Sequence, residues 1–236
     1  MSIAFEPPRG AAPASARGRP DAAYALRRVV TREDWVLAGA VRLASAANHD
    51  EAPASLLAMD GPEATAGCAT FLLTRNGRPI GTTRTRYARA GEPFPLPSLQ
   101  AFARDLHAGF GEATVVEASQ TLVDAALADR AAALVHLFKA HMLTCAVQGA
   151  EWLVAAVPET RIGFHRRVFD MEILSGAEHI TGAASPRVLM GLRYRERADR
   201  LARRLPVLAF DADDEKRFAA TGEVRFEEAE GTGVRP

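Results

Sequence analysis

Glu117 is the one charged residue in the run ATVVEASQTLV, over residues 113–123. The apolar and β-branched ends of this run predict a strand. Charged side chains within strands are rarely buried unless they have a partner or a function. Glu117 is therefore the first candidate for chemistry, as a carboxylate that accepts a proton, and an ion-paired or strand-end charge is the alternative interpretation.

Arg84 is the second candidate, and it follows the turn RNGR at residues 75–78. Asn-Gly between two strand-like runs predicts an antiparallel hairpin, because both central residues of a type I′ turn need φ > 0. In the second strand, the run TTRTR places Arg84 and Arg86 on one face. Arg84 is suited to bind a carboxylate through two hydrogen bonds; alternatively, both arginines lie on a solvated face.

Hydrophobic patterning predicts one mixed α/β domain over residues 24–205. Strands are expected at residues 24–30, 67–74, 79–87, 113–123, 151–157, 171–174 and 186–194, and helices at 31–45, 98–107, 129–149, 159–169 and 195–205. Residues 1–23, rich in Pro, Ala, Gly and Arg, are predicted to be a disordered lead-in. Residues 206–236 are predicted to be a charged tail that is loosely ordered from Asp211 onward.

The composition argues against several functional classes. Lys+Arg and Asp+Glu both number 29, so the formal charge is zero and no global field attracts nucleic acid or anionic lipid. His136 and His141 have the wrong spacing for a helical metal-binding pair, so no metal site is predicted. Cys68 and Cys145 are isolated, which predicts reduced thiols. Without an export signal or a long apolar run, we expect a cytoplasmic protein with no membrane span.

Three short motifs follow one another along the chain: Asp60-Gly-Pro-Glu63, then NGRPIGTTR ending at Arg84, then VVEASQ containing Glu117. With the later segments GFHRRVFDMEIL and ASPRVLMGLRY, they resemble the acyl-homoserine-lactone (autoinducer) synthases and the related N-acyl amino acid synthases. The patterns of that family are D-x-x-D, G-x-x-R and E-x-S-R. The expected order of strands and helices also resembles that of GNAT-type acyltransferases. The resemblance covers most of residues 24–194.

The resemblance implies a GNAT-like α/β fold, with a central mixed, mostly antiparallel sheet flanked by helices. It also implies an N-acyltransferase that moves a medium or long fatty acyl group from a thioester to the amine of an amino acid or related acceptor. An amine attacks only when neutral, so Glu117 is the candidate base that takes its proton. Backbone N–H groups where the central strands separate are expected to bind the oxyanion. No cofactor is predicted beyond the acyl donor.

The resemblance also assigns residues to the acceptor. Arg84 would bind the acceptor or pair with Glu117 and Asp60. The expected substrate-binding residues are Arg42, Asp60, Glu63, Ser119 and Gln120. Gln120 departs from the arginine of E-x-S-R and lacks its permanent charge, which weakens the assignment of activity. A catalytically degenerate protein that binds an acyl ligand or a carrier protein is therefore the rival hypothesis.

The acyl donor is predicted from what precedes the longest helix. The segment TLVDAALADRAAAL lacks the Gly-containing loop that holds the pyrophosphate of coenzyme A. Acyl carrier protein is therefore favoured over acetyl-coenzyme A as the donor, acyl-coenzyme A stays an alternative donor, and a conventional acetyl-coenzyme A enzyme is the third interpretation. Carrier proteins are acidic, so a basic patch would bind one, although the same arginines also suit a solvated helix face. The predicted patch consists of Lys139, Arg161, Arg166 and Arg167.

Overall fold

The computed structural model describes residues 24–45, 67–89, 99, 101–110, 113–180 and 183–226. The predicted lead-in, 1–23, lies outside the described residues, as do Asp60 and Glu63. Among the described residues, no helix is long and apolar enough to span a membrane.

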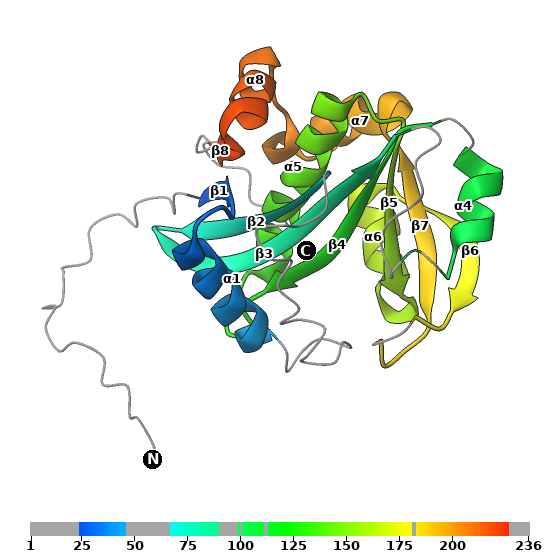
Figure 1. Cartoon of the computed structure of the whole chain (residues 1–236), viewed down its shortest axis with the longest axis horizontal. Coiled ribbons are helices and arrows are strands. Elements are labelled where there is room, and N and C mark those ends of the chain that lie inside the picture. Colours follow the sequence, from blue (N-terminus) through cyan, green and yellow to red (C-terminus); the bar gives the residue numbers. More distant parts are fainter. Residues whose placement is uncertain are drawn as a thin grey trace, which may run out of the picture.

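The chain forms an eight-stranded sheet in the order β6-β7-β5-β4-β3-β2-β1-β8 (Figure 1). Its strands are β1 (Tyr24–Arg28), β2 (Cys68–Arg75), β3 (Arg78–Ala88), β4 (Val115–Val123), β5 (Trp152–Pro158), β6 (Glu172–Glu178), β7 (Arg187–Arg193) and β8 (Glu223–Arg225). Neighbouring strands are antiparallel, except that β4 and β5 are parallel. The predicted mixed, mostly antiparallel sheet is confirmed.

Helices cover both faces of this sheet. They are α1 (Arg32–Ser45), α4 (Ala103–Phe110), α5 (Arg130–Gln148), α6 (Ile162–Phe169), α7 (Tyr194–Arg204) and α8 (Ala212–Thr221), with short 3-10 turns η2 (Glu159–Arg161) and η3 (Pro206–Leu208). Consecutive side chains of β2 lie on opposite faces of the sheet: Leu72 packs with Val41 of α1, whereas Leu73 packs with Leu137 of α5. We call these the α1 face and the α5 face.

Local sequence signals place the main elements where they were expected. Asn76 and Gly77 have φ of 51° and 76°, which forms the tight turn between β2 and β3. The Asp129 side chain accepts from the backbone N–H of Ala132 and begins α5, and Gly149 ends it in the left-handed conformation. Such signals act within a few residues, so they are visible in the sequence.

The C-terminal segment corrects one prediction. Residues 211–225 are not loosely ordered, because α8 and β8 extend the domain past residue 205. Asp211 and Asp214 form a capping box that begins α8, and β8 pairs with β1. The segment buries only two apolar side chains, Phe218 and Val224, which is too sparse a pattern to show a period.

Candidate active site

The central strands β4 and β5 separate part-way along their length. Val115–Glu117 pairs with Trp152–Val154, and the pairing ends there. Beyond this point β4 continues beside β3, and β5 continues beside β7, so the two strands diverge (Figure 1). Glu117 thus occupies the last paired position of β4, at the point of divergence. The predicted separation of the central strands is present.

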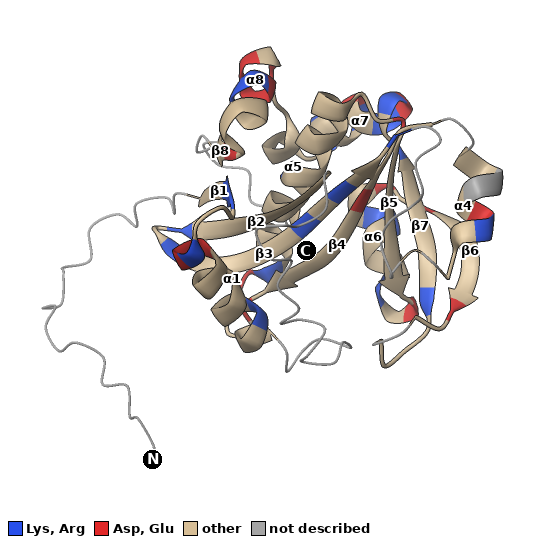
Figure 2. Ribbon diagram, in the orientation of Figure 1, with Lys and Arg blue, Asp and Glu red and all other residues tan. Residues whose placement is uncertain are grey.

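Glu117 and two arginines lie on the α1 face of adjacent strands. Arg86 of β3 is directly across from Glu117, and Arg84 is across from Ser119. Arg84 Nε donates to Ser119 Oγ over 3.1 Å. Figure 2 shows the basic positions on β3 beside the acidic position on β4. The structure therefore brings together Glu117, Arg84 and Ser119, and it adds Arg86 as the residue opposite the carboxylate.

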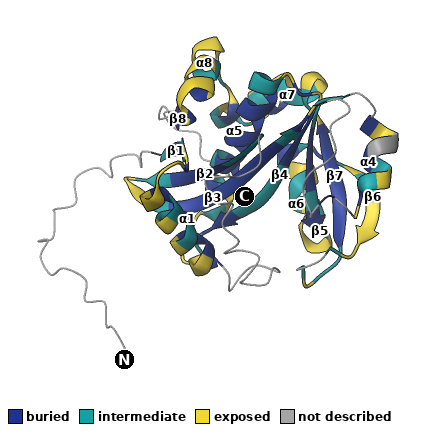
Figure 3. Cartoon of the chain, in the orientation of Figure 1, coloured by how far each residue is buried: buried dark blue, intermediate teal, exposed yellow. Residues whose placement is uncertain are grey.

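These charged side chains are inside the molecule. Glu117 is 4 % exposed, and Arg84 and Arg86 are 8 % and 6 % exposed. Figure 3 shows the buried central strands on which they lie. The interpretation of Arg84 and Arg86 as a solvated face is wrong, although their shared face is confirmed. Helices cover this side of the sheet, and charges buried there interact more strongly than they would in water.

Arg42 reaches this region from α1. It lies in the last turn of the helix and is 1 % exposed. The helix contacts both β3 and β4, and it lies on the same face of the sheet as Arg84. The structure therefore places Arg42 on the helix that covers the site, and its role in substrate binding stays a prediction.

Gln120 lies at a bulge in β4. Between the pairs Arg84–Ser119 and Thr82–Leu122, two residues of β4 face one residue of β3. Gln120 has φ of 45°, in the left-handed region that non-glycine residues seldom adopt. A bulge redirects the side chain and interrupts the alternation of faces. In the sequence motif, Gln120 follows Glu117 by three residues. The motif contains no signal that a bulge redirects the Gln120 side chain.

The comparisons with known proteins agree with this geometry. Residues 39–193 match the sequence family described as N-acyl amino acid synthase FeeM. This chain belongs to the FeeM family of N-acyl amino acid synthases. It is an acyltransferase, and the predicted resemblance is confirmed. A search of curated proteins found no match.

Solved structures show the same fold. FeeM, an N-acyl amino acid synthase from uncultured soil microbes, is 18 % identical, with 74 % of this chain and 93 % of that chain covered and a TM-score of 0.59. The acyl-homoserine-lactone synthase LasI is 13 % identical, with 87 % and 98 % covered and a TM-score of 0.52. An N-acetyltransferase from Lactobacillus plantarum is 16 % identical, with 73 % and 99 % covered and a TM-score of 0.51. This FeeM-family chain therefore has the GNAT fold that the sequence predicted.

Behind the bulge, a chain of polar side chains connects the site of this FeeM-family chain to α5. Thr83 Oγ1 lies 2.7 Å from Thr121 Oγ1 and 2.9 Å from His141 Nε2. His141 is completely buried, and burial lowers its pKa to about 3, so its ring is neutral. A neutral ring bonded to Thr83 stabilises the bulge from the α5 face. The sequence pattern offered His141 only as a metal ligand and gave no signal for this role.

Acid should destabilise the protein through His141. The unfolded chain binds a proton near pH 6.5, whereas the folded chain does so only near pH 3, so stability is lost as pH falls between these values. From pH 7 to pH 5, the wild-type free energy of unfolding should fall about 2 kcal/mol more than that of His141→Gln. Urea unfolding at both pH values measures this difference. The exposed His179→Gln is the control and should behave like the wild type; equal pH dependence in all three proteins would contradict the assignment.

The predicted basic patch is only partly on the surface. Lys139 is 5 % exposed, and its Nζ donates to the carbonyl of Ala209 over 2.8 Å and lies 5.2 Å from the Phe226 ring centre. The prediction that Lys139 lies in a surface patch is therefore wrong, because the C-terminal part of the chain covers this side of α5. The other three members, Arg161, Arg166 and Arg167, are exposed on η2 and α6.

Proposed function

We propose that the protein transfers a medium or long fatty acyl group from acyl carrier protein to the amine of an amino acid or related acceptor. Family membership supports the N-acyl transfer. The observation that carries the proposal is the position of Glu117, buried at the last paired residue before β4 and β5 diverge and across from Arg86.

Glu117 would act as the general base. The acceptor nitrogen attacks the thioester carbonyl only as a neutral amine, and it loses a proton as the C–N bond forms. A carboxylate beside the attacking nitrogen takes that proton. The C–S bond then breaks, and the sulfur leaves as a thiol after protonation. Backbone N–H groups of β4 or β5 beyond the last pair are placed to stabilise the oxyanion, since the two strands do not bond to each other there.

Arg84 would bind the acceptor carboxylate. Ser119 fixes the guanidinium through Nε. A guanidinium with a fixed plane binds a carboxylate through its terminal nitrogens, with two parallel hydrogen bonds. Arg42 would assist from α1, and the roles of Asp60, Glu63 and Gln120 stay predictions from the family motifs.

The apolar strand β5 suits the acyl chain. Its residues beyond the last pair are Ala155, Ala156 and Val157, whose side chains provide no polar group that a fatty chain would have to desolvate. On the α5 face, Phe169 of α6 and Val157 of β5 belong to one buried cluster. The acyl chain is therefore expected along the β5 side of the divergence.

Lipid extracts from cells that express the protein test the proposed function. Mass spectrometry should detect an N-acyl compound that is absent from cells expressing Glu117→Gln at the same level. Detection of no new compound, together with tight binding to acyl carrier protein, would instead support the rival hypothesis of a degenerate binding protein.

The exposed arginines should matter only for a carrier-protein donor. Neutralising Arg161, Arg166 and Arg167 to glutamine should lower kcat/KM for acyl carrier protein about tenfold at low salt and leave the rate with acyl-coenzyme A nearly unchanged. The reason is loss of attraction to an acidic partner. A matched triple variant removes three exposed arginines elsewhere: Arg32, Arg104 and Arg203. If both triple variants lower the rate equally, the patch on α6 is not a specific docking surface.

A further inference from the structure

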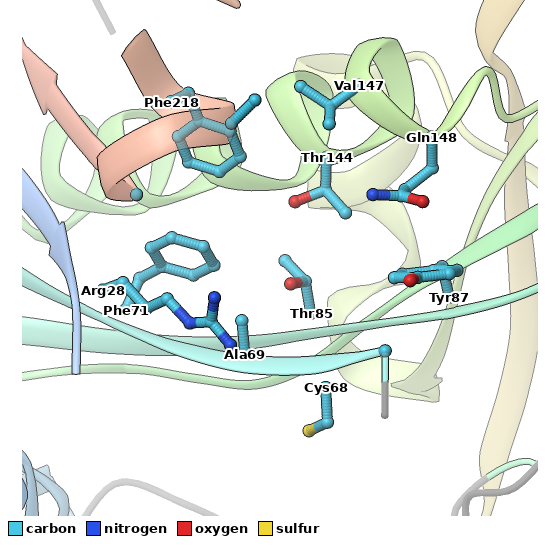
Figure 4. Close-up of a pocket in the computed structure, with 13 residues that line it drawn as sticks. Arg28, Cys68, Ala69, Phe71, Thr85, Tyr87, Thr144, Val147, Gln148 and Phe218 are labelled. Atoms are coloured by element: carbon cyan, nitrogen blue, oxygen red, sulfur yellow. The ribbon is translucent and has the colours of Figure 1, made fainter. Parts of the chain in front are cut away.

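A cavity lies on the α5 face, on the opposite side of the sheet from Glu117. Its volume is about 200 Å³, it is partly open to solvent, and it is lined by β2, β3, the last turns of α5 and the end of α8 (Figure 4). Arg28 and α8 contribute to its walls and lie outside residues 39–193, which match the family. The cavity is thus separate from the candidate active site, and part of its wall comes from outside the matched segment.

A threonine side chain of β3 faces this cavity. Thr85 is 1 % exposed and lines the cavity. Figure 4 shows the Thr85 side chain directed into the space between β3 and α5. A hydroxyl that lines a cavity can donate a hydrogen bond to a water or to a ligand there. Thr85 therefore marks a place for a polar atom of a bound molecule.

A guanidinium lines the same cavity. The Arg28 side chain extends along Phe71 toward Thr85 in Figure 4, and it forms no ion pair with any residue that the structure describes. Its backbone N–H donates to the carbonyl of Gly222 over 2.9 Å. A Cβ at Gly222 would lie 2.5 Å from Arg28 Cβ, so only glycine permits this close approach. The backbone thus fixes the position of the Arg28 Cα and Cβ atoms.

The remaining wall combines apolar side chains with the polar side chains of Thr144 and Gln148 (Figure 4). The rings of Phe71 and Phe218 are stacked with centres 5.3 Å apart, and Val147 lies across the cavity on α5. A cavity with a cation, hydroxyl groups and an aromatic wall matches a molecule with an anionic end and an apolar body. A flat carboxylate accepts hydrogen bonds from a guanidinium and a hydroxyl at the same time.

We propose that this cavity binds a small monocarboxylate with an apolar body, of about the size of an amino acid. Its carboxylate accepts hydrogen bonds from Arg28 and from the hydroxyl of Thr85. Its apolar body packs against Phe218 and Val147. Thr85 lies between Arg84 and Arg86 in β3, so the ligand contacts the back of the strand that carries the candidate active-site arginines.

Calorimetric titration of the full chain with phenylacetate tests the proposal. Binding should be detectable at about 10 mM ligand, and the neutral phenylacetamide should bind about tenfold more weakly. Arg28→Gln should weaken phenylacetate binding about tenfold, and Thr85→Val, which keeps the side-chain shape, should weaken it several-fold. Arg32→Gln removes an exposed arginine from α1 and should leave the affinity unchanged. Thermal melting of each variant verifies that the fold is retained.

Amide chemical shifts locate the bound phenylacetate. The largest changes should occur at Gly67, Gly222 and the last turn of α5, which surround the cavity. Changes centred on Glu117 and Ser119 would mean that phenylacetate occupies the other face, and this would overturn the proposal. Absence of binding, or equal binding by the wild type and Arg28→Gln, would also overturn it.

Discussion

Replacing Glu117 with glutamine should lower the rate of acyl transfer about 10²–10⁴-fold, the usual contribution of a general base, while the protein keeps its fold. Glutamine has the same shape as glutamate but cannot accept the proton that the amine loses. The measurement is kcat with saturating donor and acceptor, together with thermal melting of both proteins. Raising the pH should restore part of the variant's rate, because more of the acceptor amine is then already neutral.

The pH response separates a base from a structural charge. If Glu117 only supported the fold, Glu117→Gln would melt at a lower temperature and its rate would not recover at high pH. Glu151→Gln is the matched control, because Glu151 is an exposed carboxylate just before β5. It should retain the wild-type rate. A rate in Glu117→Gln equal to that of this control would remove Glu117 from the mechanism.

Replacing Arg84 with glutamine should lower kcat/KM for the acceptor about 10–100-fold, mainly by raising the acceptor KM. The lost interaction is a charge-assisted pair between guanidinium and carboxylate, which contributes about 1.5–3 kcal/mol. Arg84→Lys should recover only part of the loss, because an ammonium cannot make two parallel hydrogen bonds. Steady-state kinetics with varied acceptor measures these effects.

An acceptor whose carboxylate is converted to an amide provides the decisive comparison. The wild type should strongly prefer the free carboxylate, and Arg84→Gln should lose most of that preference. Arg78→Gln is the matched control, because Arg78 is an exposed arginine on the same strand that pairs with Asp124. If Arg84→Gln kept the wild-type preference, Arg84 would act on the wall of the site and not on the acceptor.

The sequence was sufficient for features that depend on nearby residues. The hairpin follows from Asn76-Gly77, because those two residues adopt positive φ at low cost. The shared face of Arg84 and Arg86 follows from the two-residue period of a strand. The helix α5 follows from its apolar spacing between Asp129 and Gly149.

The tertiary structure alone decided how distant segments meet. It set the register that places Arg86, and not Arg84, across from Glu117, and it placed a bulge at Gln120. It buried Lys139 beneath the C-terminal part of the chain. These outcomes depend on the balance of packing and hydrogen bonding between segments far apart in sequence, and no short motif contains that balance. The residue types that could perform acyl transfer are therefore visible in the sequence, whereas their pairing, burial and direction come from the fold.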